Sequence, residues 1–117
     1  MKIDLTDKVA VVTGGAAGIG EHLSRRLAAE GAHVVIGDVN EEQGQLVASD
    51  IGGAFLRCDV TRPEDSQAVI DFAVSSYGGV DIVALNAGIM TTCGIGDDFD
   101  IDVYRRAMSI NLDGVVY

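Results

Sequence analysis

The stretch TGGAAGIG, Thr13–Gly20, joins an apolar run, KVAVV at 8–12, to a helix-like stretch, EHLSRRLAAEGA at 21–32. Glycine destabilises the interior of both strands and helices, so glycines at this corner need a physical reason. A parallel strand that ends in a glycine-rich turn and opens a helix presents unpaired backbone N–H groups at the positive end of the helix dipole. The stretch therefore predicts a turn that binds phosphate.

Three of these glycines are expected to have different roles. Gly14 and Gly18 leave room for a pyrophosphate to approach the backbone, and Gly20 lets the helix pack closely on the sheet. Their spacing, G-x-x-x-G-x-G, differs from the commoner G-x-G-x-x-G motif, and no Gly-Lys-Ser/Thr follows to make a P-loop. On the glycines alone, a plain tight turn is an open alternative.

The rest of the chain alternates strand and helix patterns. Short runs rich in β-branched residues predict strands at 8–13, 33–38, 54–60 and 80–88. Helical patterns follow them at 19–31, 41–53, 63–79 and 101–110. Because right-handed crossovers join parallel neighbours, this order predicts an α/β fold with an open parallel sheet and helices on both faces. The length of 117 residues predicts a single domain, residues 1–117.

The third of these helices has a recognisable start. Thr61 and Glu64 form the T-x-x-E pattern of a capping box, with Pro63 in the first turn. We therefore expect Thr61 to cap the helix and Gly78 to end it.

Asp38 ends the second predicted strand, 24 residues after Gly14. A carboxylate at this place can accept hydrogen bonds from both ribose hydroxyls of an adenosine. The same charge would repel a 2′-phosphate, and the sequence has no Lys or Arg between Lys8 and Arg25 to offset it. The sequence therefore predicts NAD in preference to NADP. The open alternative is that Asp38 only caps a loop.

Two further segments end strands at the same edge of the predicted sheet. The Asp59 carboxylate could accept a hydrogen bond from the amino group of adenine while Val60 covers the adenine ring. Asn86-Ala87-Gly88 ends the fourth strand, where it runs into a turn, and its small residues would let a cofactor ribose lie against the backbone. Either segment alone could be a simple turn.

The charge of the chain argues against two classes of partner. The sequence has 18 Asp and Glu against 8 Lys and Arg, a formal net charge of −10 at pH 7. This charge repels phosphate backbones, so we expect no binding to nucleic acid or to an anionic membrane. No stretch approaches the roughly 18 consecutive apolar residues of a membrane span. The start of the chain does not resemble a secretory signal, so a cytoplasmic location is expected.

The two cysteines, Cys58 and Cys93, form no C-x-x-C pattern and have no cluster of histidines near them in sequence. We interpret both as reduced structural residues and expect no metal site.

Together, TGGAAGIG, Asp38, CDV at 58–60, NAG at 86–88 and SINLDG at 109–114 resemble the short-chain dehydrogenase/reductase family. The resemblance covers about residues 6–117. It implies a Rossmann-type doubly wound sheet with strands ordered 3-2-1-4, a nicotinamide dinucleotide, and hydride transfer to or from a small alcohol or carbonyl substrate. The cofactor contacts that it carries over are Gly14, Gly18, Ile19, Gly20, Asp38, Val39, Asp59, Val60, Asn86, Ala87 and Gly88.

Asn111 matches the catalytic Asn of the family, whose backbone carbonyl holds a water in a proton relay. On the sequence alone, Asn111 could equally be a polar residue that kinks a helix. The family's Tyr-x-x-x-Lys motif, in which the Lys lowers the pKa of the Tyr, does not occur in this chain, because no lysine follows Lys8.

The resemblance therefore implies the amino-terminal, cofactor-binding part of an NAD-dependent short-chain oxidoreductase, truncated before the catalytic segment and inactive alone. The alternative is a non-catalytic dinucleotide-binding or interaction module. The fourth strand would leave an unpaired edge, so marginal stability or association is expected. The family is usually homo-oligomeric, and the truncation puts that expectation in doubt here.

Overall fold

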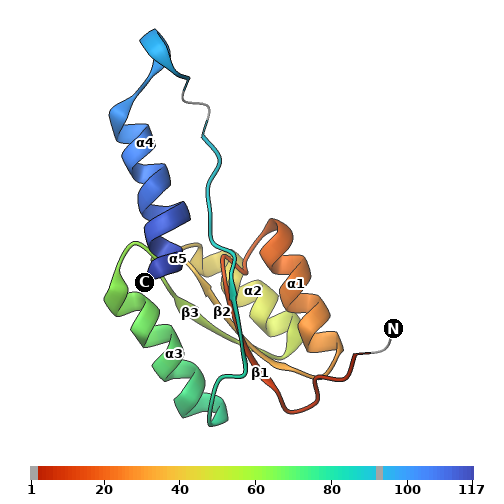
Figure 1. Cartoon of the computed structure of the whole chain (residues 1–117). Coiled ribbons are helices and arrows are strands. Elements are labelled where there is room, and N and C mark those ends of the chain that lie inside the picture. Colours follow the sequence, from red (N-terminus) through yellow and green to blue (C-terminus); the bar gives the residue numbers. More distant parts are fainter. Residues whose placement is uncertain (1–2, 92–93) are drawn as a thin grey trace.

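Four parallel strands form the centre of the computed structural model, which describes residues 3–91 and 94–117 (Figure 1). The strands are β1 (Val9–Thr13), β2 (His33–Asp38), β3 (Ala54–Arg57) and β4 (Ile82–Leu85). Their order is β3-β2-β1-β4, as the resemblance implied. In the register of the sheet, Val11 of β1 lies beside Val35 of β2 and Val83 of β4.

Three helices cover the sheet: α1 (Gly18–Ala29) and α2 (Glu41–Ile51) lie on one face, and α3 (Pro63–Tyr77) lies on the other (Figure 1). Successive strand residues point to opposite faces, which gives two apolar cores. Val12 and Ile36 pack with Val47 of α2, and Val11 and Val35 pack with α3. Every residue of β1 is buried, as its uninterrupted apolar sequence predicts for a central parallel strand.

The third and fourth strands are shorter than predicted. β4 begins only at Ile82; the preceding residue, Asp81, donates its amide to the Val9 carbonyl oxygen at 2.8 Å and accepts from the Val9 amide with its side chain at 2.9 Å. β4 ends at Leu85, and the amides of the next two residues donate to the Thr13 hydroxyl at the end of β1, that of Asn86 also to the carbonyl oxygen of Ala84 at 3.0 Å. β3 ends at Arg57, so residues 58–60 form the loop that follows it.

The predicted capping box before α3 is wrong. Arg62 is the N-cap residue, and no side chain caps the helix. The hydroxyl and the amide of Thr61 instead donate to Oδ1 of Asp59, at 2.7 Å and 3.0 Å. The end of α3 is as predicted: Gly78 has φ +88°, a left-handed conformation that glycine adopts without strain.

The last helical segment extends beyond the predicted end at residue 110. A 3₁₀ turn, η1 (Gly96–Asp98), precedes α4 (Ile101–Met108), which continues through a π-helical segment, η2 (Ser109–Asp113), into α5 (Gly114–Val116). The side chain of Asp100 caps α4 by accepting from the amides of Asp102 and Val103. α4 extends away from the sheet (Figure 1), and α5 returns to it where Gly114 packs on Val60.

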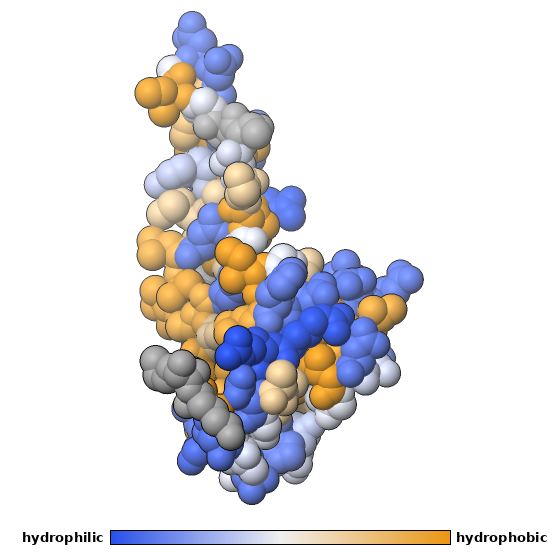
Figure 2. Space-filling view, turned by 90° about the vertical axis from the view of Figure 1, so that its right-hand side faces the viewer, coloured by the Kyte–Doolittle hydropathy of each residue, from blue (hydrophilic) through white to orange (hydrophobic). Residues whose placement is uncertain are grey.

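β4 forms one edge of the described sheet, as expected, and apolar side chains are exposed near it. Figure 2 shows hydrophobic surface gathered along the left side of that view. The exposed large apolar residues of β4 and the end of the chain are Val83, Leu85, Val115, Val116 and Tyr117. Among the described residues, no helix is both long and apolar enough to cross a bilayer.

Candidate functional site

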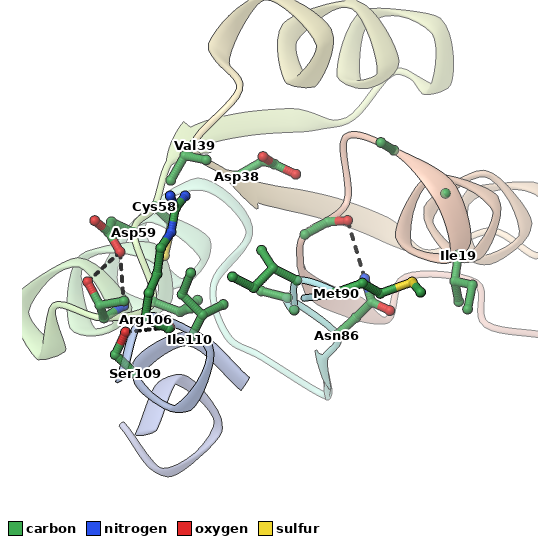
Figure 3. Close-up of a pocket in the computed structure, with 18 residues that line it drawn as sticks. Ile19, Asp38, Val39, Cys58, Asp59, Asn86, Met90, Arg106, Ser109 and Ile110 are labelled. Carbon is green, nitrogen blue, oxygen red and sulfur yellow. Dashed lines mark hydrogen bonds between the residues drawn. The ribbon is translucent and has the colours of Figure 1, made fainter. Parts of the chain in front are cut away.

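The carboxyl ends of the strands surround a cavity of about 860 Å³, closed on other sides by the start of α1 and by α4 and η2 (Figure 3). This volume is within the range of ligand-binding pockets. Its lining includes all the predicted cofactor contacts except Gly20: Gly14, Gly18, Ile19, Asp38, Val39, Asp59, Val60, Asn86, Ala87 and Gly88. The fold thus brings four separate segments of the sequence around one space.

The start of α1 faces this cavity and has no side-chain cap. Its N-cap residue is Ala17, whereas α2 is capped by Asn40, whose side-chain oxygen accepts from the Gln43 amide. Gly18 has φ +56°, and a Cβ built there would meet no atom within 4 Å. The backbone N–H groups of this turn are therefore accessible to an anion, and the helix dipole favours one.

Gly14 and Gly20 permit contacts within the protein. A Cβ on Gly14, whose φ is +68°, would lie 2.9 Å from Cα of Ala87. A Cβ on Gly20 would overlap the carbonyl oxygen of Gly14 and the side-chain amide of Asn86. Gly14 thus admits the segment after β4, and Gly20 lets α1 approach the loop rather than the sheet itself.

Thr13 joins the ends of β1 and β4. Its Oγ1 accepts from the amides of Asn86 at 3.1 Å and Ala87 at 3.2 Å, and donates to the carbonyl oxygen of Ala84 at 3.4 Å. The Asn86 side chain donates to the carbonyl oxygen of Gly14 at 3.3 Å. Sequence reasoning missed Thr13, although its place at the end of a buried strand, directly before the glycines, was a usable signal.

The Asp38 carboxylate is held by two backbone amides. Oδ2 accepts from Ala16 of the glycine loop at 3.1 Å, and Oδ1 accepts from Asn40 at 2.9 Å. Asp38 thus caps a loop, as the alternative had it, and also lines the cavity. The two interpretations are compatible, because each carboxylate oxygen has more than one acceptor site.

Two residues after β3 also line the cavity. Hydrogen bonds from the hydroxyl and the amide of Thr61 hold the pKa of Asp59 below its usual value, so this carboxyl is charged at neutral pH. Val60 is only 7% exposed, because most of its side chain packs in the core beside Val69.

Cys58 is buried beside this loop. Burial, with the charges of Asp65, Asp59 and Asp38, raises the pKa of its thiol to about 11. The thiol is therefore protonated at neutral pH, which agrees with a structural cysteine. Cys93 lies outside the described residues. Among the described residues, no group of three or more His, Cys, Asp or Glu is placed to hold a metal ion.

Asn111 lies in the π-helical segment and does not line the cavity. Its side-chain amide makes two hydrogen bonds to the backbone of Ile89: Oδ1 accepts from the amide at 2.8 Å, and Nδ2 donates to the carbonyl oxygen at 2.9 Å. Asn111 thus anchors the segment after β4. Its role in a proton relay stays a prediction.

The lining also contains residues that the sequence did not predict as cofactor contacts: Ala17, Cys58, Thr61, Ile89, Met90, Arg106, Ser109 and Ile110. Arg106 and Ile110 are four residues apart, so a shared helix face was foreseeable. Where that helix lies relative to the sheet was not, because the position depends on contacts between distant segments. Ile19, predicted at this site, is 80% exposed at the start of α1.

Comparisons with known proteins agree with this architecture. The family model described as short chain dehydrogenase matches residues 8–117. A 3-alpha-(or 20-beta)-hydroxysteroid dehydrogenase of Mycobacterium tuberculosis is 40% identical over 95% of this chain and 43% of the relative. The mitochondrial (-)-isopiperitenol/(-)-carveol dehydrogenase of Mentha piperita is 42% identical over 94% of this chain and 43% of the relative.

A solved structure is also similar. The crystal structure of 3-ketoacyl-(acyl-carrier-protein) reductase from Brucella melitensis, complexed with NADH, matches with a TM-score of 0.92 and 33% identity. The match covers 97% of this chain and 48% of that one. The chain therefore spans less than half the length of the relatives named here.

Replacing Thr13 tests the junction between β1 and β4. Thr13→Val keeps the shape but leaves the Ala87 amide without its acceptor and the Asn86 amide with only the carbonyl oxygen of Ala84, at 3.0 Å. We expect the free energy of unfolding in urea to fall by about 1–3 kcal/mol. Thr13→Ser, which keeps the hydroxyl, is the control and should lose less. Equal losses in the two variants would contradict the role given to the hydroxyl.

Proposed function

The chain belongs to the short-chain dehydrogenase family, and on this premise we propose that it is the cofactor-binding part of an oxidoreductase that uses NAD. One observation carries the proposal: the uncapped start of α1 and the anchored carboxylate of Asp38 face the same cavity. One binds an anion and the other accepts hydrogen bonds from hydroxyl groups, as a dinucleotide requires.

The residues present fit such a ligand. The first-turn amides of α1 would bind the pyrophosphate, with Gly18 leaving the space beside them open. Asp38 would accept from the hydroxyls of the adenosine ribose, and Asp59 from the adenine amino group. The small residues Ala87 and Gly88 would lie against the second ribose. When bound, NAD supplies the group that accepts a hydride.

The preference for NAD rests on how Asp38 is held. Its carboxylate is tied to Ala16 and Asn40, so it cannot turn away from a 2′-phosphate without breaking both hydrogen bonds. Arg106 brings a positive charge into the same cavity, which the sequence argument did not include. We propose that the negative charge of Asp38 outweighs the positive charge of Arg106 in the choice between NAD and NADP. The position of Asp38 is fixed by hydrogen bonds to the backbone, whereas Arg106 extends from an exposed helix position.

For the whole protein, we propose a small alcohol or carbonyl substrate. This is supported by the two curated relatives, which are named as dehydrogenases of hydroxysteroids and of isopiperitenol and carveol. The present sequence contains no Tyr-x-x-x-Lys motif, so we propose that these 117 residues bind the dinucleotide without turning over a substrate. Homo-oligomerisation and a cytoplasmic location stay predictions.

The lack of a Tyr-x-x-x-Lys motif in the present sequence also favours a second candidate function, a non-catalytic dinucleotide-binding module. Calorimetric titration with NADH, combined with sedimentation analysis, separates the two candidates. Saturable binding by a folded monomer supports the module, and association of the chain supports the part of a longer reductase.

Gly18→Ala tests the phosphate turn. The substitution places a methyl group in the open space beside the start of α1 and strains a backbone with φ +56°. We expect NADH affinity, measured by calorimetry, to fall by about tenfold or more. Gly52→Ala is the matched control, because Gly52 has φ +66° and equally open surroundings but ends α2 away from the cavity. Equal NADH affinity in the two variants would contradict the proposed turn.

The chain alone should show no dehydrogenase activity. With NAD and a panel of primary, secondary and cyclic alcohols, we expect no formation of NADH at 340 nm above the rate without protein. Turnover that depends on protein concentration would show that the chain contains its own acid/base group.

Asp38→Asn tests the choice between NAD and NADP. Removing the charge should raise NADPH affinity relative to NADH by roughly five- to tenfold, because about one kcal/mol of like-charge repulsion is lost. Asp71→Asn is the control, since Asp71 is exposed on α3 and its loss changes the net charge equally. If both variants shift the ratio alike, Asp38 does not select the cofactor.

A further inference from the structure

Arg106 has an unusual setting among the basic residues of this acidic chain. It is the only Lys or Arg in the described lining of the cavity, where two carboxylates, Asp38 and Asp59, are also found. It lies on α4 one turn before Ile110, which lines the same cavity. Its neighbour Arg105 does not line the cavity.

The Arg106 guanidinium forms no ion pair with a residue that the structure describes. Arg25, Arg26, Arg57 and Arg62 each pair with a carboxylate, whereas Arg106 makes no salt bridge with any residue in the described ranges. The side chain is exposed, and the hydrogen bond assigned to Arg106 uses its backbone carbonyl, which accepts from the Ser109 hydroxyl at 2.7 Å. The guanidinium therefore has its hydrogen-bonding and stacking capacity available to a ligand.

The direction of the side chain shows which part of a ligand it would meet. In Figure 3, Arg106 extends from α4 toward Val39 and Cys58, at the ends of β2 and β3. This end of the cavity also has apolar walls, because Val39 is 56% exposed there and Ile110 faces it from η2. A flat aromatic ring fits between apolar walls and a planar cation.

We propose that Arg106 is a positioning residue for the adenine ring of the dinucleotide. Its guanidinium stacks on the ring and forms the outer wall of the adenine subsite, opposite the ends of β2 and β3. The inference rests on the proposed function and adds a residue to that site. Stacking explains the setting better than a phosphate contact, because Asp38 lies at the same end and opposes any additional negative charge on the ligand.

The test measures the affinity of the 117-residue chain for NADH, NADPH, ADP-ribose and reduced nicotinamide mononucleotide, which lacks adenine. Arg106→Ala should weaken NADH and ADP-ribose about fivefold and leave the mononucleotide within about twofold. Arg106→Lys keeps the positive charge but lacks the planar guanidinium group, so it should also lower the affinity for both adenine-containing ligands, NADH and ADP-ribose. Arg105→Ala is the control with the same change of net charge and should alter none of the four affinities.

Three results would overturn the inference: full NADH affinity in Arg106→Ala or Arg106→Lys, equal losses for the mononucleotide, or a loss confined to NADPH, which would mark a phosphate contact. Wild-type chain that binds neither NADH nor ADP-ribose would instead contradict the proposed function and remove the basis of this inference. Thermal unfolding of each variant should match the wild type, because the Arg106 side chain is exposed and has no salt bridge among the described residues.

Discussion

The site depends on the close approach of three backbone segments: the loop after β1, the start of α1 and the segment after β4. Only glycine fits at positions 14 and 20, since a Cβ at either would enter the space of a neighbouring segment. Thr13 and Asn86 then tie these segments together through side-chain hydrogen bonds. This packing fixes the position of the first-turn amides of α1 relative to the ends of β1 and β4.

The loops around the cavity are held by polar side chains rather than by ladder hydrogen bonds. Backbone groups beyond a strand end lack their ladder partners and must find others. Asp38 supplies one for Ala16 of the glycine loop, and Asn111 supplies two for Ile89 after β4. Residues that a family resemblance assigns to a ligand or to catalysis are thus also those that keep the loops in place. Substituting them therefore removes hydrogen bonds of the loops as well as the proposed ligand contacts.

Much of the fold could be predicted from the sequence, because β1 and β2 are uninterrupted apolar runs and the helices end at glycines such as Gly52 and Gly78. The predicted capping box is wrong because the sequence pattern does not show which group near Thr61 its hydroxyl contacts. In the structure that group is the Asp59 carboxylate. Gly14 was predicted only as a ligand contact, because the sequence cannot show that residues 86 and 87, far along the chain, also pack against it. Arg106 was missed for the same reason: its place in the cavity depends on where α4 sits, which no local pattern encodes.

Charge explains why this packing matters for an anionic ligand. The chain carries a net charge of −10, and the described lining has two carboxylates against one guanidinium. The sequence from 9 to 24 contains no Lys or Arg, so basic side chains of the glycine loop cannot provide the attraction for a phosphate. Backbone N–H dipoles can provide it, but their effect falls off within about one turn of the helix end. A phosphate bound at this site would therefore need direct contact with the backbone. The open space at Gly18 allows that contact, and the packing at Gly14, Gly20 and Thr13 holds the loop that would make it.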